Sequence, residues 1–149
     1  MSVPAVRMVG MHHPWRELRE QEHIDVRWLT LPGDLRGMTD GHSTIWMDDR
    51  LLQVERRCTL AHEQAHIRLG HDGHQEGREE YRARKLAAQQ LIHRDDLIRA
   101  LQWAMSLEEC ADELWVTPEV LRDRLDFMHP SEKLLIAAAV EAGKESHAD

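Results

Sequence analysis

The hydrophobic and polar positions of the first 50 residues predict short elements. Residues 14–19 are predicted to form a short helix, with a proline in its first turn. Apolar and polar side chains alternate through residues 24–29, as in a half-buried strand, and residues 44–47 are rich in β-branched and aromatic side chains. Glycine and aspartate mark a wide loop between these two segments. We therefore expect two strands that pair antiparallel, with Trp28 and Trp46 in the core.

The pattern becomes helical after Asp49. Apolar residues recur at three- and four-residue steps from Leu51 to Leu69, and Gly70 is the expected C-cap. A second long helix is predicted over residues 76–92, and shorter helices are expected to begin near Asp95, Ser106, Thr117 and Ser131. The predicted fold class is α+β and mostly helical, with a short antiparallel hairpin or sheet packed on a long helix and a C-terminal helical bundle.

Length and composition suggest one domain over residues 1–149, with a core over residues 14–92 and a helical extension over residues 93–149. Cys58 and Cys110 lie in apolar-periodic segments, which predicts free, buried cysteines in a reducing compartment. No apolar run approaches the roughly 18 residues of a membrane span, and the N-terminus lacks the apolar region of a signal peptide. We therefore expect a cytoplasmic protein that does not enter a membrane.

The charge of the chain argues against nucleic acid as a partner. Acidic residues number 27 against 19 basic ones, and the net charge is −8. Residues 94–149 alone carry six basic and 13 acidic residues, a net of −7. Residues 107–127 could form a helix-turn-helix, but a recognition helix offers cations to phosphates, and this segment is acidic. A helical bundle packed on the core, with a surface for a protein partner, is the better interpretation.

Histidines are concentrated in one short window. The chain has 11 of them, and four lie between residues 62 and 74. His62, Glu63 and His66 form the pattern HExxH inside the long predicted helix. Residues four apart share one helix face, so His62 and His66 can bind one zinc ion together. Glu63 lies about 100° round the helix, where its carboxylate can act as the general base on a water molecule.

A catalytic zinc site needs a third protein ligand. On the next predicted helix, Glu79 and Glu80 flank the apolar stripe almost symmetrically, and periodicity alone does not separate them. The metzincin pattern fails, because its glycine and third histidine would fall on Leu69 and Asp72. Other candidates lie in the connecting loop and at the start of the next helix: His71, Asp72, His74 and Glu76.

The segment over residues 54–66 resembles the active helix of the ImmA/IrrE family of metallo-endopeptidases, in particular its small actinobacterial and phage-borne members. The Gly70-His71 pair after the helix is similar to that family, and so is a Glu79-Glu80 segment that runs into alanines. The resemblance implies a zincin-like fold with a gluzincin-type zinc site, in which Glu80 is the third ligand. It also implies an Asp or Asn four residues later that hydrogen-bonds a ligand histidine. Arg84 stands there instead, which is a departure from the family pattern.

The resemblance implies an enzyme that cleaves a protein substrate, such as the helix-turn-helix repressor of a phage or mobile element. An alternative interpretation is a zinc-containing regulator that binds a protein partner, as an anti-repressor would, without proteolysis. Arg84 gives that alternative some weight. Three residues are candidates for stabilising the oxyanion: His42, Arg78 and Tyr81.

Overall fold

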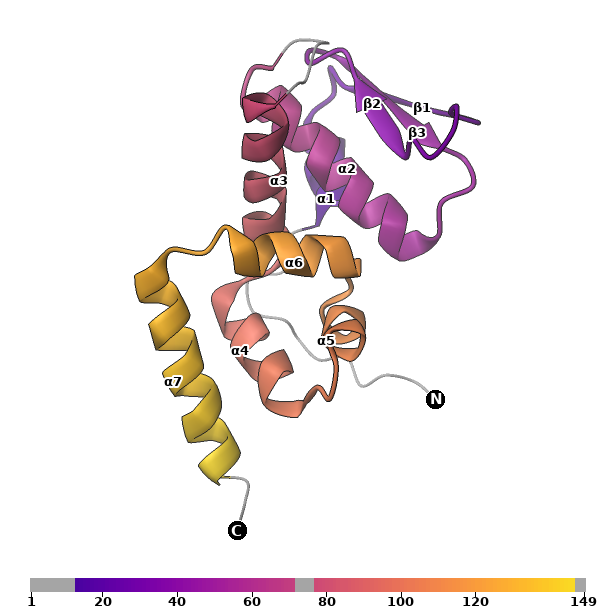
Figure 1. Cartoon of the computed structure of the whole chain (residues 1–149). Coiled ribbons are helices and arrows are strands. Elements are labelled where there is room, and N and C mark those ends of the chain that lie inside the picture. The colour runs from indigo at the N-terminus through magenta and orange to yellow at the C-terminus, as the bar shows by residue number, and fades with distance from the viewer. Residues whose placement is uncertain (1–12, 72–76, 147–149) are drawn as a thin grey trace.

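The computed structural model describes residues 13–71 and 77–146. The described residues form seven helices and three strands (Figure 1). In chain order these are α1 (Pro14–Glu20), β1 (Asp25–Leu29), β2 (Gly37–Thr39), β3 (Thr44–Asp48), α2 (Gln53–Arg68), α3 (Arg78–Leu91), α4 (Arg94–Trp103), α5 (Leu107–Leu114), α6 (Pro118–Asp126) and α7 (Pro130–Ser146). The mostly helical α+β class predicted from the sequence is confirmed. Within the described ranges, no helix is long and apolar enough to cross a bilayer.

The expected antiparallel pairing of the two predicted strands is wrong. The strand order is β1-β3-β2, with β1 parallel to β3 and β2 antiparallel to β3. The loop after β1 carries the chain past β3 to the short strand β2, which then returns to β3 through a tight turn. Asp40 forms that turn, because its Oδ1 accepts hydrogen bonds from the backbone N–H groups of His42, Ser43 and Thr44. A three-residue strand leaves too short a pattern to be recognised.

One face of the sheet packs on α2. Ile45 and Met47 of β3 are completely buried and contact a small core that also contains Leu60 of α2. Helix α1 lies against α2, where the Gln64 side chain donates a hydrogen bond to the Pro14 carbonyl oxygen and Arg68 pairs with Glu17. These contacts hold α2 between the sheet, α1 and α3 (Figure 1).

Helices α2 and α3 approach each other through small side chains. Ala61 and Ala65 of α2 and Ala83 and Ala87 of α3 all belong to the larger core, and none is more than 3% exposed. Helix axes come closest where the residues between them are small. The polar side chains that flank this alanine contact therefore lie within reach of one another.

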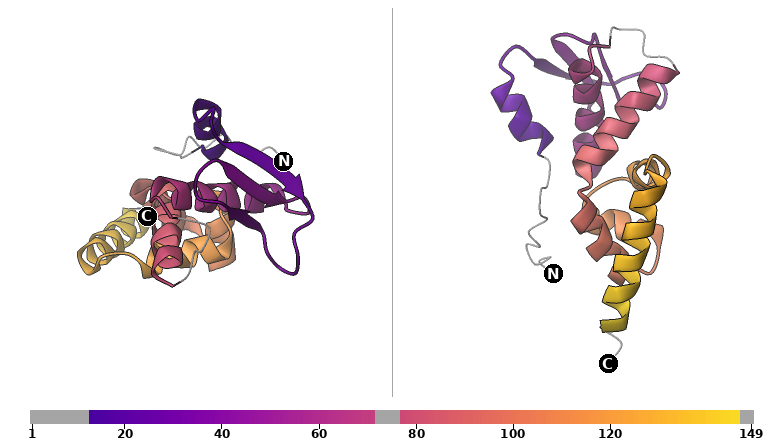
Figure 2. Two further views of the ribbon diagram at one scale, coloured as in Figure 1. Left: turned by 90° about the horizontal axis from the view of Figure 1, so that it is seen from above. Right: turned by 90° about the vertical axis from the view of Figure 1, so that its left-hand side faces the viewer.

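Helices α4 to α7 form the helical C-terminal region expected from the sequence. The side chains of Ser106 and Thr117 cap α5 and α6 as predicted, each accepting a backbone N–H at the first turn. Cys58 and Cys110 are both free and buried, which confirms that expectation. Two further views show α7 at the end of the molecule opposite the sheet (Figure 2). The sheet and helices α1 to α3 thus lie at one end of the molecule. Helices α4 to α7, which we call the tail, follow α3 and extend toward the other end.

Candidate metal centre

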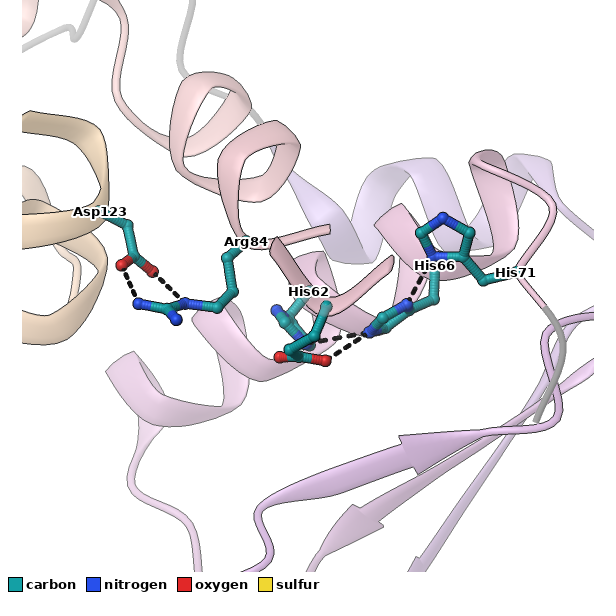
Figure 3. A network of polar contacts seen from close by, with 6 residues as sticks. His62, His66, His71, Arg84 and Asp123 are labelled. Carbon is teal, nitrogen blue, oxygen red and sulfur yellow. Dashed lines mark hydrogen bonds and ion pairs between the residues drawn. The ribbon is translucent and has the colours of Figure 1, made fainter. Parts of the chain in front are cut away.

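Helix α2 places two histidines on one face. The Nε2 atoms of His62 and His66 are 3.2 Å apart, one helical turn from each other. The His66 side chain is 1% exposed and that of His62 is 23% exposed. Both rings therefore direct Nε2 to the same small region beside the helix (Figure 3).

A carboxylate from α3 completes the cluster. Glu80 Oε1 lies 2.9 Å from His62 Nε2, and Glu80 Oε2 lies 3.0 Å from His66 Nε2. One donor atom from each of the three residues lies within 4.8 Å of the other two. Of the two glutamates that the sequence left open, Glu80 is the one that reaches the histidines. The side chain of Glu79 is partly buried, and its Oε2 has no hydrogen-bond partner among the described residues.

The pKa values of these groups respond to their proximity. Burial alone would raise the pKa of Glu80, but the hydrogen bonds from His62 and His66 outweigh it, and the pKa of Glu80 is strongly lowered. Burial alone would lower the pKa of His62, but the hydrogen bond to Glu80 and the negative charges of Glu63 and Glu80 raise it. The carboxylate is therefore held ionised, as a metal ligand must be.

The donor set fits a divalent metal. Two imidazole nitrogens and one carboxylate oxygen are the ligand types of a catalytic zinc site that keeps one position open. A tetrahedral zinc ion with bonds of about 2.0–2.1 Å separates its ligand atoms by about 3.3–3.4 Å. Here the two histidine Nε2 atoms are 3.2 Å apart, and a different Glu80 oxygen approaches each of them, at 2.9 and 3.0 Å. With one oxygen from Glu80, the three donor atoms lie within 4.8 Å of one another, so shifts of these side chains would accommodate the ion.

Glu63 is buried beside this cluster. Its side chain is buried, and its Oε2 has no hydrogen-bond partner in the part of the chain that the structure describes. Burial raises the pKa of Glu63, against the effect of the two nearby histidines. The β2 backbone passes close to it: a Cβ atom built on Gly37 would lie 3.4 Å from Glu63 Cγ and 2.6 Å from Thr59 Cγ2. A larger residue at position 37 would therefore require a shift of the Thr59 side chain or of the backbone.

His71 contacts the far side of the His66 ring. Helix α2 ends in a Schellman motif, in which Gly70 has a φ of 73°, the Gly70 N–H bonds the Ile67 carbonyl and the His71 N–H bonds the His66 carbonyl. This turn brings the buried His71 ring back to the helix, with its Nδ1 at 2.9 Å from Nδ1 of His66. A metal on Nε2 of His66 leaves an N–H on Nδ1, which His71 can accept. The sequence marks this role only through the Gly70-His71 pair.

Arg84 turns toward α6 and not toward His62 or His66. Its guanidinium forms two hydrogen bonds with the carboxylate of Asp123 on α6, one of them 3.2 Å from Nε to Oδ2 (Figure 3). This ion pair raises the pKa of Arg84. The bond to a ligand histidine that the family resemblance implies at this position is thus replaced by a link between α3 and α6. A hydrogen bond to His66 is made by His71 instead.

The remaining candidates lie elsewhere or outside the described residues. Tyr81 is half exposed and packs edge-on against Phe127, with ring centroids 4.5 Å apart. Arg78 and His42 are exposed. None of these three belongs to the metal-ligating group found among the described residues. Three candidates from the loop and the start of the next helix fall outside the described residues: Asp72, His74 and Glu76.

Comparison with known proteins gives one match. Residues 14–126 match the model of a peptidase family described as the IrrE N-terminal-like domain. The match spans α1 to α6 and includes His62, Glu63, His66 and Glu80. No curated protein and no solved structure matches the chain.

Proposed function

Because the chain belongs to the family of IrrE N-terminal-like peptidases, we propose that it is a zinc-dependent endopeptidase that cleaves a protein substrate. The observation that carries the proposal is the convergence of His62, His66 and Glu80 from two helices, with donor atoms within 4.8 Å of one another. A peptidase of this kind needs an open metal site beside a general base, and the buried carboxylate of Glu63, on α2, lies close to His62, His66 and Glu80.

In this proposal each residue of the site has a separate role. His62, His66 and Glu80 would hold the ion, which when bound supplies Lewis acidity toward the peptide carbonyl and a lowered pKa for water. Glu63 would accept the proton of the attacking water and then donate it to the leaving amine. Its raised pKa suits both steps, because a carboxyl group whose pKa lies nearer the working pH exchanges protons more readily. His71 would keep the His66 ring in the orientation that points Nε2 at the ion.

The decisive experiment is Glu63→Gln in the zinc-loaded protein. The substrate to test first is a helix-turn-helix repressor encoded beside the gene, since the resemblance of the active helix implies such a target. We expect the variant to lose roughly 100- to 10,000-fold in cleavage rate, the typical contribution of a general base. It should still bind one zinc ion per chain, because the three ligands are intact. Metal content by mass spectrometry and cleavage by gel electrophoresis measure the two quantities.

Glu119→Gln is the matched control, since Glu119 is an exposed carboxylate on α6. It should cleave like the unmodified protein. Equal cleavage by Glu63→Gln and the unmodified protein would contradict the assignment of the base.

A second candidate function is partner binding without proteolysis. The observation that favours it is Arg84, which stands where the family pattern has an acidic residue and which pairs with Asp123. Mixing the chain and the repressor with and without chelator separates the two functions. A stable complex without cleavage products in either condition supports the regulator. Cleavage that disappears with chelator supports the peptidase.

A further inference from the structure

A hollow lies at the other end of α2 from the metal centre. Its volume is about 580 Å³, and it is bordered by α1, β1, the first turns of α2 and the turn between α5 and α6. Its lining on α2 runs from Gln53 to Arg57, more than one turn before His62. The hollow is thus separate from the metal centre. Its size falls within the range of small-molecule sites, roughly 300–1,000 Å³.

The lining is strongly basic in an acidic protein. No aspartate or glutamate of residues 13–71 and 77–146 lines the hollow, whereas four arginines and one histidine do: Arg16, Arg19, Arg56, Arg57 and His13. The whole chain has a net charge of −8. The pKa of His13 is lowered first by burial and then by the charges of Arg16 and Arg57, as expected where cations gather. Arg16 and Arg19 are exposed and three residues apart on α1, so both guanidinium groups lie on one face of that helix.

Tryptophans from three elements share the hollow with these arginines. Trp15 and Trp28 stack with ring centroids 5.8 Å apart and planes 16° apart, and Arg56 lies 5.3 Å from the Trp28 ring centroid. Trp28 was expected in the core, and it does lie on the same face of the sheet as its partner Met47, but 43% of it is exposed beside Trp15 and Arg56. Trp115, at the end of α5, is 55% exposed. Large aromatic surfaces open to solvent usually mark a binding site.

The backbone of Trp115 is held in a conformation that tryptophan rarely adopts. Its φ of 57° is the only positive φ of a non-glycine residue in residues 13–71 and 77–146. Helices that end in the left-handed region favour glycine or asparagine there. The Trp115 carbonyl accepts a hydrogen bond from Arg57, which fixes the turn against α2. Glycine would satisfy the backbone, so the indole ring is retained at a conformational cost, a pattern common at functional sites.

From this arrangement we propose that the hollow binds a small anion bearing a planar ring, of the nucleotide class. Arginines recognise phosphate groups through paired N–H donors, and exposed tryptophans stack on the faces of bases. A small ligand responds to the local cluster of arginines, whereas a long polyanion would also meet the acidic remainder of the molecule. The ligand would contact α1, β1 and α2 on one side and the turn before α6 on the other, and so join the tail to the core.

The test is calorimetric titration of the full chain in the presence of chelator, so that phosphate binding at the metal centre does not contribute. The probes are ADP, GDP, CDP and UDP, with inorganic pyrophosphate as the ring-free probe and adenosine as the uncharged one. We expect at least one diphosphate to bind ten times more tightly than pyrophosphate and adenosine, with tryptophan quenching and weaker binding at higher salt. Lack of binding by all four diphosphates at millimolar concentration, or equal affinity for pyrophosphate, would overturn the proposal.

Variants locate the site. Trp115→Gly removes the ring but suits the left-handed backbone, so the fold should persist while the affinity falls at least tenfold. Arg19→Ala should cause a similar loss. Trp103→Ala is the matched control, because Trp103 is 56% exposed on α4 and does not line the hollow. Unchanged affinity in Trp115→Gly and Arg19→Ala would overturn the site. Glu63→Gln should bind the nucleotide as tightly as the unmodified protein. The nucleotide proposal can therefore be tested even if the proposed peptidase function is wrong.

Discussion

The two halves of α2 carry polar centres that are built in opposite ways. In the C-terminal half, His62 and His66 extend from a helix whose backbone fixes their spacing, and both are in contact with Glu80 of α3. In the N-terminal half, long arginine side chains meet tryptophans that come from α1, β1 and the end of α5. The first centre depends on one helix pair. The second depends on the position of the tail relative to the core.

This contrast has a consequence for how each centre responds to change. A short, buried side chain in a rigid helix loses its function when its length or its supporting contact changes. The exposed side chains of Arg16 and Arg19 can reorient when a neighbour is replaced, so single changes there should have smaller effects than changes at the metal centre. The following predictions test that contrast, beginning with the largest effect.

Replacement of Glu80 should have the largest effect on metal binding. Glu80→Ala removes one of three donors, and we expect zinc affinity to fall by more than about 100-fold, beyond the roughly 10- to 100-fold typical of an outer partner. Glu79→Ala is the matched control, because Glu79 is the preceding residue of α3 but does not reach the histidines. Competition with a zinc-sensitive dye measures both. Equal losses in the two variants would mean that α3 presents Glu79 when metal is bound.

Replacement of His71 should have the next largest effect. His71→Ala removes the group that faces Nδ1 of His66, and we expect a loss of roughly 10- to 100-fold in zinc affinity. His71→Asn keeps a hydrogen-bond acceptor and should recover part of it. The absorption spectrum of the cobalt-substituted protein should also shift in His71→Ala, since the His66 ring is less constrained. An unchanged cobalt spectrum and unchanged affinity would show that the Schellman turn alone orients His66.

Gly37→Ala tests the contact between β2 and the metal half of α2. The new Cβ atom would lie 2.6 Å from Thr59 Cγ2, so the Thr59 side chain or the backbone must shift, and we expect the free energy of unfolding to fall by about 1–3 kcal/mol. Serine lacks Cγ2, so Thr59→Ser in the same chain should restore much of the loss. Urea unfolding of the single and double variants measures this. A double variant no more stable than Gly37→Ala would place the clash on the Trp46 carbonyl oxygen, which is 3.3 Å away.

The Arg84–Asp123 pair should have the smallest effect. It joins α3 to α6, and the Arg84 side chain is 48% exposed, so solvent screens the attraction. A double-mutant cycle with Arg84→Ala and Asp123→Ala should give a coupling of about 1 kcal/mol or less. If the pair positions the tail, the same variants should also weaken nucleotide binding in the hollow. Coupling without any change in the hollow would separate the two links between core and tail.

The sequence predicted the features that depend on neighbours along the chain. The helices from α2 onward follow the spacing of apolar residues, and the caps at Ser106 and Thr117 are local hydrogen bonds. His62 and His66 were found for the same reason, since a four-residue spacing on a helix determines a shared face.

The features that were missed depend on contacts between distant segments. The parallel pairing of β1 with β3 follows from the three-residue strand β2, whose pattern is too short to recognise. Glu79 and Glu80 look equivalent on a helical wheel; the family resemblance implied Glu80, and the approach of α3 to α2 brings Glu80 to the two histidines. The hollow is formed by four separate segments of the chain. No local sequence pattern predicts that Trp15, Trp28 and Trp115 line the same hollow.

The alanine contact between α2 and α3 also sets the distance between the two histidines on α2 and Glu80 on α3. Protein ligands hold a metal at bond lengths that vary by only about 0.2 Å, so a change in the spacing of the two helices would be felt at the donor atoms. A single methyl group added at Ala65 or Ala83 would widen the spacing of α2 and α3 and move Glu80 away from both histidines. Selectivity between ions of different radius would then be tuned by residues that never touch the ion. The smallest side chains of the core would thus determine how far apart the donor atoms lie.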